Sequence, residues 1–304
     1  MSALGNVVKT LQEQGKINPP NWVAENTQYL TIMGSVAYGV SNDTSDMDLY
    51  GFTIPPKDMV FPHLRGEIPG FGRQIQRFEQ FQKHHVVLED PRGEKHNREV
   101  DMSVYSIVKY FQLCMMCNPN MIDSMFTPER CVLVNTKIGR IMRDNRKLFL
   151  SKKAWHSFKG YAYAQLRKAT TKKPEGKRVE TVEKYGWDVK FGYHVVRLVL
   201  EVEQILRDCD LELDRKDARE HMKAVRAGEY SLEDIKKWFY DREVSLGKLY
   251  DSSPLRHSPD EGAIKQVLLN CLEEHFGSLS AVVPNTDKLA AALRAIRDIA
   301  DDTL

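Results

Sequence analysis

The sequence predicts an α+β protein in which a small mixed β-sheet domain is followed by a helical domain. Two observations predict the sheet: the apolar run over residues 29–33, and the alternation Asp46-Met47-Asp48-Leu49, which is typical of a strand with one polar and one apolar face. A third predicts the helices, because from Val104 onward apolar residues mostly recur at helical intervals. We expect the sheet domain to occupy residues 1–130 and the helical domain residues 131–304.

The individual elements can be predicted in chain order. Residues 3–14 have the pattern of an amphipathic helix, and strands are expected over 28–33 and 47–54, the second ending at Pro55-Pro56 because proline removes ladder donors. A strand or irregular edge falls within residues 77–88, and residues 99–103 alternate again, which predicts a strand beside the one that carries Asp48. The charge, Pro and Gly of residues 172–185 predict a mobile surface loop. Helices are expected over 105–117, 121–126, 136–148, 152–171, 188–208, 215–227, 231–251, 260–276 and 285–300.

The composition is ordinary for a globular protein, with 42% apolar and 28% charged residues. A formal net charge of +2 does not by itself indicate a nucleic-acid-binding protein. The sequence has no apolar run near eighteen residues and no secretory signal pattern at its start, so we expect neither a membrane span nor export. The five cysteines are an odd number in mostly apolar contexts, which favours reduced thiols and a cytoplasmic location.

A Gly-Ser turn and three aspartates are the residues most indicative of chemistry. Gly34 follows the first apolar strand and lets a triphosphate approach the backbone, while the Ser35 hydroxyl can hold phosphate oxygens. Asp46 and Asp48 share one strand face, and the strand over residues 99–103 would bring Asp101 beside them. Such carboxylates suit Mg²⁺ bound between protein and substrate phosphates. Glu99 is the alternative third carboxylate, and an ordinary polar turn over residues 41–46 is the alternative for the whole motif.

A basic, aromatic segment between residues 151 and 178 indicates RNA binding, since basic groups neutralise phosphates and aromatic faces stack on bases. The alternative is a helix with aromatics in the core and solvated lysines, because Trp155, Phe158 and Ala162 follow helical spacing. The candidate RNA-binding residues are Lys153, His156, Lys159, Arg167 and Lys168.

Four further basic residues are candidates for binding the nucleotide phosphates. Lys190, His194 and Arg197 share one helical face, and Lys152 precedes the basic segment. Asp188 would orient Lys190 or cap the helix. The alternative is a structural cluster in which these groups pair with Glu201 and Glu203 or are merely solvated.

The motifs resemble those of the DNA polymerase β-like nucleotidyltransferase superfamily, whose pattern reads roughly GS-x-A-x-G, a spacer, then S-D-x-D. The matching positions are Gly34, Ser35, Ala37, Gly39, Ser45, Asp46 and Asp48. Within that superfamily the chain is similar to the RNA-ligase-associated, RNA repair group of bacteria and phages. The blocks that carry this similarity include Asn118-Pro119-Asn120 and the D-x-K-x-x-x-H-x-x-R spacing over 188–197, and it extends from about residue 28 to 245.

The resemblance implies a polymerase-β-like catalytic domain over residues 1–130 followed by a substrate-binding helical domain. It implies a metal-dependent transfer of NMP from an NTP such as ATP to a hydroxyl acceptor, an RNA 3′ end, with release of pyrophosphate. Two Mg²⁺ ions, for which Mn²⁺ can substitute, would be bound by Asp46, Asp48 and Asp101. An RNA ligase or repair enzyme is the expected partner. Two alternatives stay open: an enzyme that adenylylates protein hydroxyls, as in antitoxin-like members of the superfamily, and a non-catalytic binding module.

Overall fold

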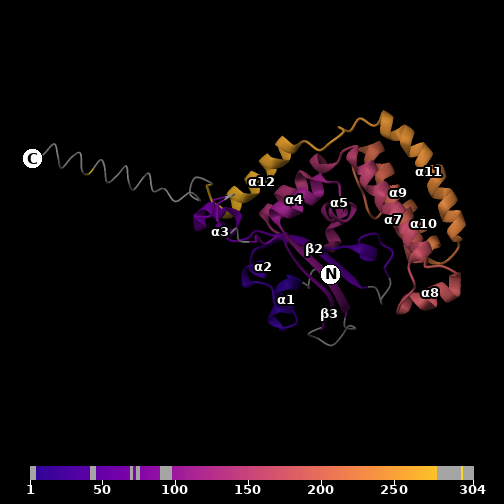
Figure 1. The fold of residues 1–304 in the computed structure, drawn as a ribbon, viewed down its shortest axis with the longest axis horizontal. Coiled ribbons are helices and arrows are strands. Elements are labelled where there is room, and N and C mark those ends of the chain that lie inside the picture. Colours follow the sequence, from indigo (N-terminus) through magenta and orange to yellow (C-terminus); the bar gives the residue numbers. More distant parts are fainter. Residues whose placement is uncertain are drawn as a thin grey trace, which may run out of the picture.

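The computed structural model describes residues 5–41, 46–68, 71–72, 76–89, 98–278 and 296. Its sheet has five strands in the order β3-β4-β2-β1-β5 (Figure 1). Strand β1 is antiparallel to both β2 and β5, β3 is antiparallel to β4, and β2 and β4 run parallel. The sheet is therefore mixed, as the sequence predicts. The strands are β1 (Thr27–Ile32), β2 (Met47–Thr53), β3 (Gln80–Leu88), β4 (Arg98–Ser106) and β5 (Val132–Asn135).

Helices cover the sheet and form the rest of the described chain. Figure 1 shows α4 and α5 next to the sheet and a group formed by α7, α9, α10 and α11 at one side of it. Helix α9 is the centre of this group, since α7, α10 and α11 all pack against it, and α12 returns to α6 and α4. The helices are α1 (Val7–Glu13), α2 (Asn21–Glu25), α3 (Lys57–Val60), α4 (Ile107–Met115), α5 (Pro119–Phe126), α6 (Lys137–Asp144), α7 (Lys153–Thr171), α8 (Lys177–Tyr185), α9 (Val189–Asp208), α10 (Lys216–Arg226), α11 (Leu232–Ser252) and α12 (Glu261–Phe276), with short 3₁₀ turns at Gly34–Val36, Pro62–Arg65, Glu129–Cys131 and Arg146–Phe149.

The two central strands differ in how their faces are used. Every residue of β1 is buried, so this strand lies inside the core. In β2 the apolar Met47 and Leu49 are buried, whereas Asp48 and Tyr50 are half-buried on the other face. Alternation along an extended strand places Asp48 and Tyr50 on one side, where they meet the helical part of the molecule instead of the apolar interior.

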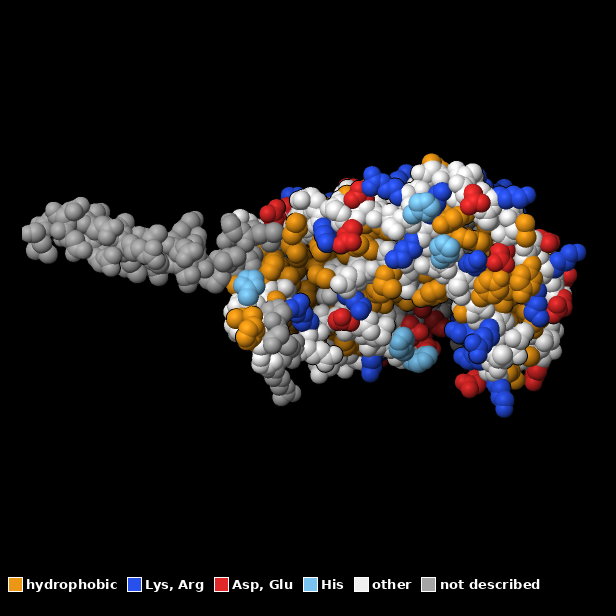
Figure 2. All heavy atoms as spheres, turned by 45° about the horizontal axis from the view of Figure 1, so that its top comes forward, with side chains coloured by type: hydrophobic (Ala, Val, Ile, Leu, Met, Phe, Trp, Pro, Cys, Tyr) orange, Lys and Arg blue, Asp and Glu red, His pale blue; other side chains and the backbone are white. Residues whose placement is uncertain are grey.

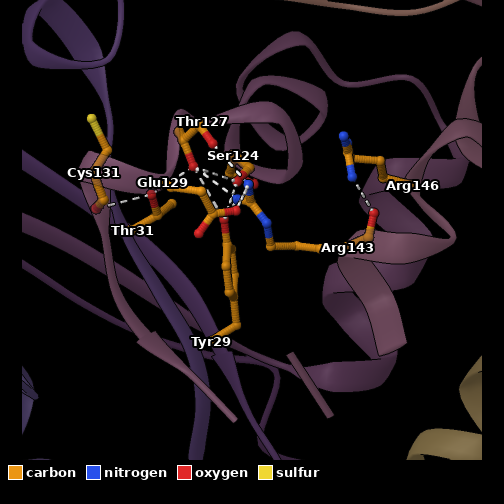
Figure 3. Close-up of polar contacts among 8 residues, drawn as sticks. All are labelled: Tyr29, Thr31, Ser124, Thr127, Glu129, Cys131, Arg143 and Arg146. Carbon is orange, nitrogen blue, oxygen red and sulfur yellow. Dashed lines mark hydrogen bonds and ion pairs between the residues drawn. The ribbon is translucent and has the colours of Figure 1, made fainter. Parts of the chain in front are cut away.

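A buried polar network fixes β1 to the helices beneath it (Figure 3). The Tyr29 hydroxyl donates to the Ser124 carbonyl at 2.7 Å and accepts from Arg143 Nη1 at 2.8 Å. Arg143 Nη2 donates to the Thr127 carbonyl at 3.0 Å and to Glu129 at 2.9 Å. Since buried polar groups stabilise a fold only when they are hydrogen-bonded, this network holds β1, α5 and α6 in one arrangement.

Most predicted elements are confirmed, and the differences have tertiary causes. Residues 99–103 do form a strand beside β2, but β4 continues to Ser106, where the serine side chain caps α4. The mobile loop predicted over residues 172–185 is wrong in its second half, because Lys177–Tyr185 forms α8. Contacts to α9 stabilise this helix: Arg178 pairs with Asp188 at 3.2 Å and lies 5.1 Å from the Phe191 ring centroid. The helix predicted over 285–300 lies outside the described residues apart from position 296.

Strand β5 was not predicted, and it lies beyond the expected domain boundary at residue 130. Its four half-buried residues pair with β1, and α6 follows directly and packs on the same strand. We propose that the division between the sheet and helical parts be placed after Asn135, since the sheet continues to that residue.

The cysteines lie mostly in the buried part of the protein. All five cysteines are unpaired. Burial raises the pKa of Cys114 and Cys117, which keeps these thiols protonated and unreactive. Among residues that the structure describes, no helix combines the length and apolarity that a membrane span requires.

Candidate active site

The parallel pairing of β2 and β4 places two of the predicted aspartates directly side by side. Asp48 is the register partner of Asp101, and both side chains lie on the same half-buried face. Neighbouring strands are about 4.8 Å apart, so two carboxylates in this position lie within reach of one ion. Asp46 precedes β2 by one residue and is exposed. The three side chains that the sequence predicts to act together thus lie near one another, at the same end of the neighbouring strands β2 and β4.

The Gly-Ser turn lies against Asp48. The Met33 amide donates to the Asp48 carbonyl at 2.7 Å, which carries β1 one residue past its end before the 3₁₀ turn at Gly34–Val36 begins. Gly34 has a φ of 67°, in the left-handed region, and a Cβ at this position would collide with Oδ2 of Asp48. Glycine is therefore required twice over, for its backbone conformation and for the close approach of the carboxylate. Ser35 is half-buried in the same turn.

The electrostatics of Asp48 fit a site for a cation. Burial raises the pKa of Asp48, and the carboxylates of Asp101 and Asp46 raise it further, while Lys190 lowers it. Carboxylates that disfavour one another's charge in a half-buried position are stabilised by a positive ion between them. The donor set consists of oxygen ligands, which is the chemistry that Mg²⁺ and Mn²⁺ prefer. The residues present therefore fit a divalent metal.

A bulge in β3 adds two histidines that the sequence reading did not single out. The register shifts between Lys83 and Val86, and His85 adopts a φ of 56° within this bulge. Its amide donates to Asp101 Oδ1 at 2.8 Å, and His84 Nδ1 lies 3.6 Å from the same oxygen. The backbone of β3 thus orients the Asp101 carboxylate. The consecutive histidines in the predicted edge 77–88, opposite the strand 99–103, were the available signal.

The alternative carboxylate, Glu99, belongs to this second group. Glu99 pairs with the His85 imidazole, and this pairing raises the pKa of His85. Ligand atoms of His85, Glu99 and Asp101 all lie within 4.8 Å of one another. Asp101 therefore stands between two sets of donors, with Asp48 on one side and Glu99 with His85 on the other.

Figure 2 shows the surroundings of these groups on the molecular surface. Acidic side chains lie in a hollow, with histidine side chains at one rim and a group of Lys and Arg side chains at the other. His84 and His85 lie beside Asp101, and Lys190 is exposed and is the largest positive influence on Asp48. The hollow is therefore acidic and the rim opposite the histidines is basic, as binding of a metal together with an anionic ligand requires.

The start of α9 places Lys190 next to the aspartates but gives His194 and Arg197 other surroundings. Asp188 caps the helix by accepting from the Lys190 amide at 3.0 Å, so its predicted capping role is the one the geometry shows. Burial, with the nearby charges of Arg197 and Lys190, lowers the pKa of His194 well below its usual range. His194 is thus a neutral imidazole at pH 7, with its ring 4.8 Å from that of Tyr193.

Arg197 lies in a buried cluster with acidic partners. Its Nη1 bonds to the Asp123 carboxylate and the Tyr38 hydroxyl, and it lies 3.6 Å from Glu201. Asp123 is fully buried and Arg197 is 6% exposed. The pairing with Glu201 that the sequence left open is present, and Nη1 of the guanidinium is bound by protein groups, whereas Nε has no hydrogen-bond partner among the described residues. We therefore do not propose Arg197 as a direct phosphate ligand.

Some basic residues of the α7 segment are paired within the protein, and others are exposed. Lys152 is buried, donates to the Asp251 carbonyl at 3.2 Å and lies 5.4 Å from the Tyr250 ring centroid, so it joins α7 to the end of α11. Lys159 pairs with Glu243 at 3.4 Å. Four of the candidates are exposed: Lys153, His156, Arg167 and Lys168. Their exposure is compatible with RNA binding and equally with side chains that are only solvated. Trp155, Phe158 and Ala162 are buried, so the core-facing alternative holds for those three.

Paired carboxylates on parallel strands beside a Gly-Ser turn define the class, a nucleotidyltransferase of the polymerase β type. Residues 8–226 match the model of the RNA repair pathway DNA polymerase beta family (RlaP). The chain belongs to this family, which confirms the resemblance inferred from the motifs.

Two other comparisons gave no informative relative. A search of curated proteins found no match. Among solved structures, the chain is similar to a nucleotidyltransferase-like protein from Exiguobacterium sibiricum with 11% identity and a TM-score of 0.27, over 88% of this chain and 79% of the other.

Proposed function

We propose that this protein is a metal-dependent RNA nucleotidyltransferase that transfers NMP from an NTP to the 3′ hydroxyl of an RNA during repair. The observation that carries the proposal is the register pair Asp48 and Asp101, with Gly34 packed against Asp48. This arrangement supplies two carboxylates and a phosphate-accepting turn within one half-buried recess. The RNA acceptor is supported by the family match and by the exposed basic residues of α7.

Asp46, Asp48 and Asp101 would hold the two divalent ions. When bound, such ions neutralise charge on the phosphates and on the attacking and leaving oxygens. The half-buried position strengthens these interactions, because charges act more strongly where water is excluded.

The remaining residues would position the two substrates. Gly34 and Ser35 would receive the β and γ phosphates, and the exposed Lys190 adds a positive charge beside Asp48. The acceptor oxygen forms a bond to the α-phosphorus while the bond from that phosphorus to the bridging oxygen breaks, and pyrophosphate leaves. Asp101, oriented by the His85 amide, is placed to accept the hydroxyl proton.

The test incubates the purified full-length protein with Mg²⁺, each of the four labelled NTPs, and either cellular RNA or cellular protein. We expect label in an RNA band that ribonuclease removes, and none with Asp48→Asn, which keeps the size of the side chain but removes its charge. Label in a protein band would favour the protein-adenylylating alternative. Absence of any Mg²⁺-dependent NTP turnover would favour the non-catalytic binding module.

A matched control separates loss of chemistry from loss of fold. Asp144→Asn changes an exposed aspartate at the end of α6, outside the recess, and should leave transfer unchanged. Equal loss of transfer in Asp48→Asn and Asp144→Asn would remove the catalytic assignment of Asp48.

A further inference from the structure

A row of tyrosines continues the face that carries the aspartates. Tyr50 follows Asp48 by two residues on β2, and Tyr105 follows Asp101 by four on β4, so all four side chains lie on the same side of the sheet. The rings of Tyr50 and Tyr105 lie 6.3 Å apart between centroids. Burial, then Tyr105, then the Asp48 charge raise the pKa of Tyr50 to about 12. The Tyr50 phenol therefore lies close to the Asp48 carboxylate.

Helices α5 and α7 bring polar groups and a third tyrosine to the same place. The Asn118 side-chain amide donates to the Tyr161 hydroxyl at 2.8 Å, and the Asn120 side chain lies close enough to the Tyr50 hydroxyl to lower its pKa against the larger effect of burial. Tyr161 is close enough to Tyr50 and Tyr105 to contribute to raising the pKa of both. The Asn-Pro-Asn block therefore does more than begin α5: Asn118 holds the Tyr161 hydroxyl, and Asn120 lies beside Tyr50, two residues from Asp48 on β2.

Tyr161 is exposed at this position, although it lies on a helix with a substantial core face. Its side chain is 38% exposed, while Phe158 and Ala162 of the same helix are fully buried. Tyr163, two residues on, is equally exposed at 38% but points elsewhere, with its hydroxyl donating to Glu243 at 2.7 Å and its ring 4.9 Å from that of Phe239. Tyr161 and Tyr163 thus lie on the same helix and are equally exposed, but they contact different residues.

We propose that Tyr161, with Tyr50 and the amides of Asn118 and Asn120, forms a nucleobase subsite adjoining the aspartates. It stacks the base of the incoming NTP or of the RNA 3′-terminal nucleotide on the exposed Tyr161 ring. The subsite rests on the proposed function, since it adjoins the site of that reaction.

The chemistry of the group selects a nucleobase over a purely apolar ligand. Ring faces stack on any base, which gives a sequence-tolerant contact. The amides and phenol hydroxyls offer donors and acceptors of the kind that base edges and ribose hydroxyls use. Because β4 carries Tyr105 together with Asp101, the subsite lies within the recess rather than on a remote surface.

The experiment measures equilibrium binding of two fluorescent probes to the full-length protein in Ca²⁺, which supports binding without turnover. One probe is 2-aminopurine riboside triphosphate, and the other is a short single-stranded RNA with a 3′-terminal 2-aminopurine, whose fluorescence falls on stacking. Tyr161→Leu removes the planar face, Tyr161→Phe keeps it, and Tyr163→Leu is the matched control on the same helix. Thermal unfolding of each variant checks the fold.

We expect Tyr161→Leu to weaken binding of one probe by about 5- to 150-fold, the range of one base–aromatic stack, and the affected probe identifies the nucleotide. Tyr161→Phe and Tyr163→Leu should bind as the wild type does. Unchanged binding of both probes to Tyr161→Leu, or an equal loss in Tyr163→Leu, would overturn the subsite while leaving the proposed function standing. A wild-type protein that binds neither probe would refute the subsite and the proposed function together.

Discussion

Replacing Gly34 by alanine tests whether the Gly-Ser turn sets the position of the Asp48 carboxylate. The structure gives this substitution two separate effects. The backbone at Gly34 has a φ of 67°, and the added Cβ would collide with Asp48 Oδ2. The first effect acts on stability and the second on the geometry of the site, so they can be measured apart.

The size of each effect follows from the conformation. An alanine held in the left-handed region costs about 1–2 kcal/mol in the free energy of unfolding, which lowers Tm by about 2–3 °C in a protein of this size. The collision moves the carboxylate away from its position opposite Asp101, and a displacement of about 1 Å reduces catalysis on the order of 100-fold. We therefore expect Gly34→Ala to remain folded at 25 °C and to lose most of its nucleotidyl transfer.

The assay follows initial rates of labelled NMP transfer and thermal unfolding for Gly34→Ala and for a control, Gly66→Ala. Gly66 has a similar φ of 77°, but a Cβ there has no heavy atom within 4 Å. The Tm of Gly66→Ala should fall by about as much as that of Gly34→Ala, and its kcat/KM should remain at the wild-type value. Wild-type kcat/KM in Gly34→Ala would refute the idea that this turn positions Asp48, and an equal loss of activity in both variants would show a general effect of strain.

Three further predictions concern the charged groups. Mg²⁺ at 100 times its Kd should stabilise the wild type by about 2.7 kcal/mol but not Asp48→Asn, as calorimetry with and without a chelator would show, and equal stabilisation of both would argue against a site at Asp48. Arg197→Met should destabilise the fold by about 3–5 kcal/mol, because it leaves Asp123 buried without its cation, and Asp123→Asn in the same chain should recover part of this loss. An unchanged denaturation midpoint with a raised KM for NTP would instead make Arg197 a phosphate ligand. Burial raises the pKa of Glu201 well above 4.5, so the folded state binds its proton more tightly than the unfolded state does. The free energy of unfolding should therefore fall as pH rises above about 4.5 towards the raised pKa, and less so in Glu201→Gln; identical pH profiles would contradict this.

The sequence by itself predicted the parts that depend on local pattern. Alternation in residues 46–49 and 99–103 is a property of an extended chain, so the facing of Asp48 and Asp101 could be inferred before any pairing was known. The Gly34-Ser35 turn was predicted because glycine lets a ligand approach the backbone, and the structure adds that Gly34 is left-handed and lies against Asp48.

The remaining features depend on contacts between segments far apart in the chain. Spacing placed Arg197 on one face with Lys190, but only the tertiary structure shows that Asp123 of α5 and Tyr38, which follows the Gly34–Val36 turn, bind its Nη1. The bulge at His85 is defined by its pairing with β4, and Arg178 of α8 pairs with Asp188 at the start of α9, so both features depend on neighbours outside their own segment. Local periodicity determined which residues share a face, whereas the tertiary structure decided what each face meets, because burial and charge pairing are set by neighbours that no local pattern specifies.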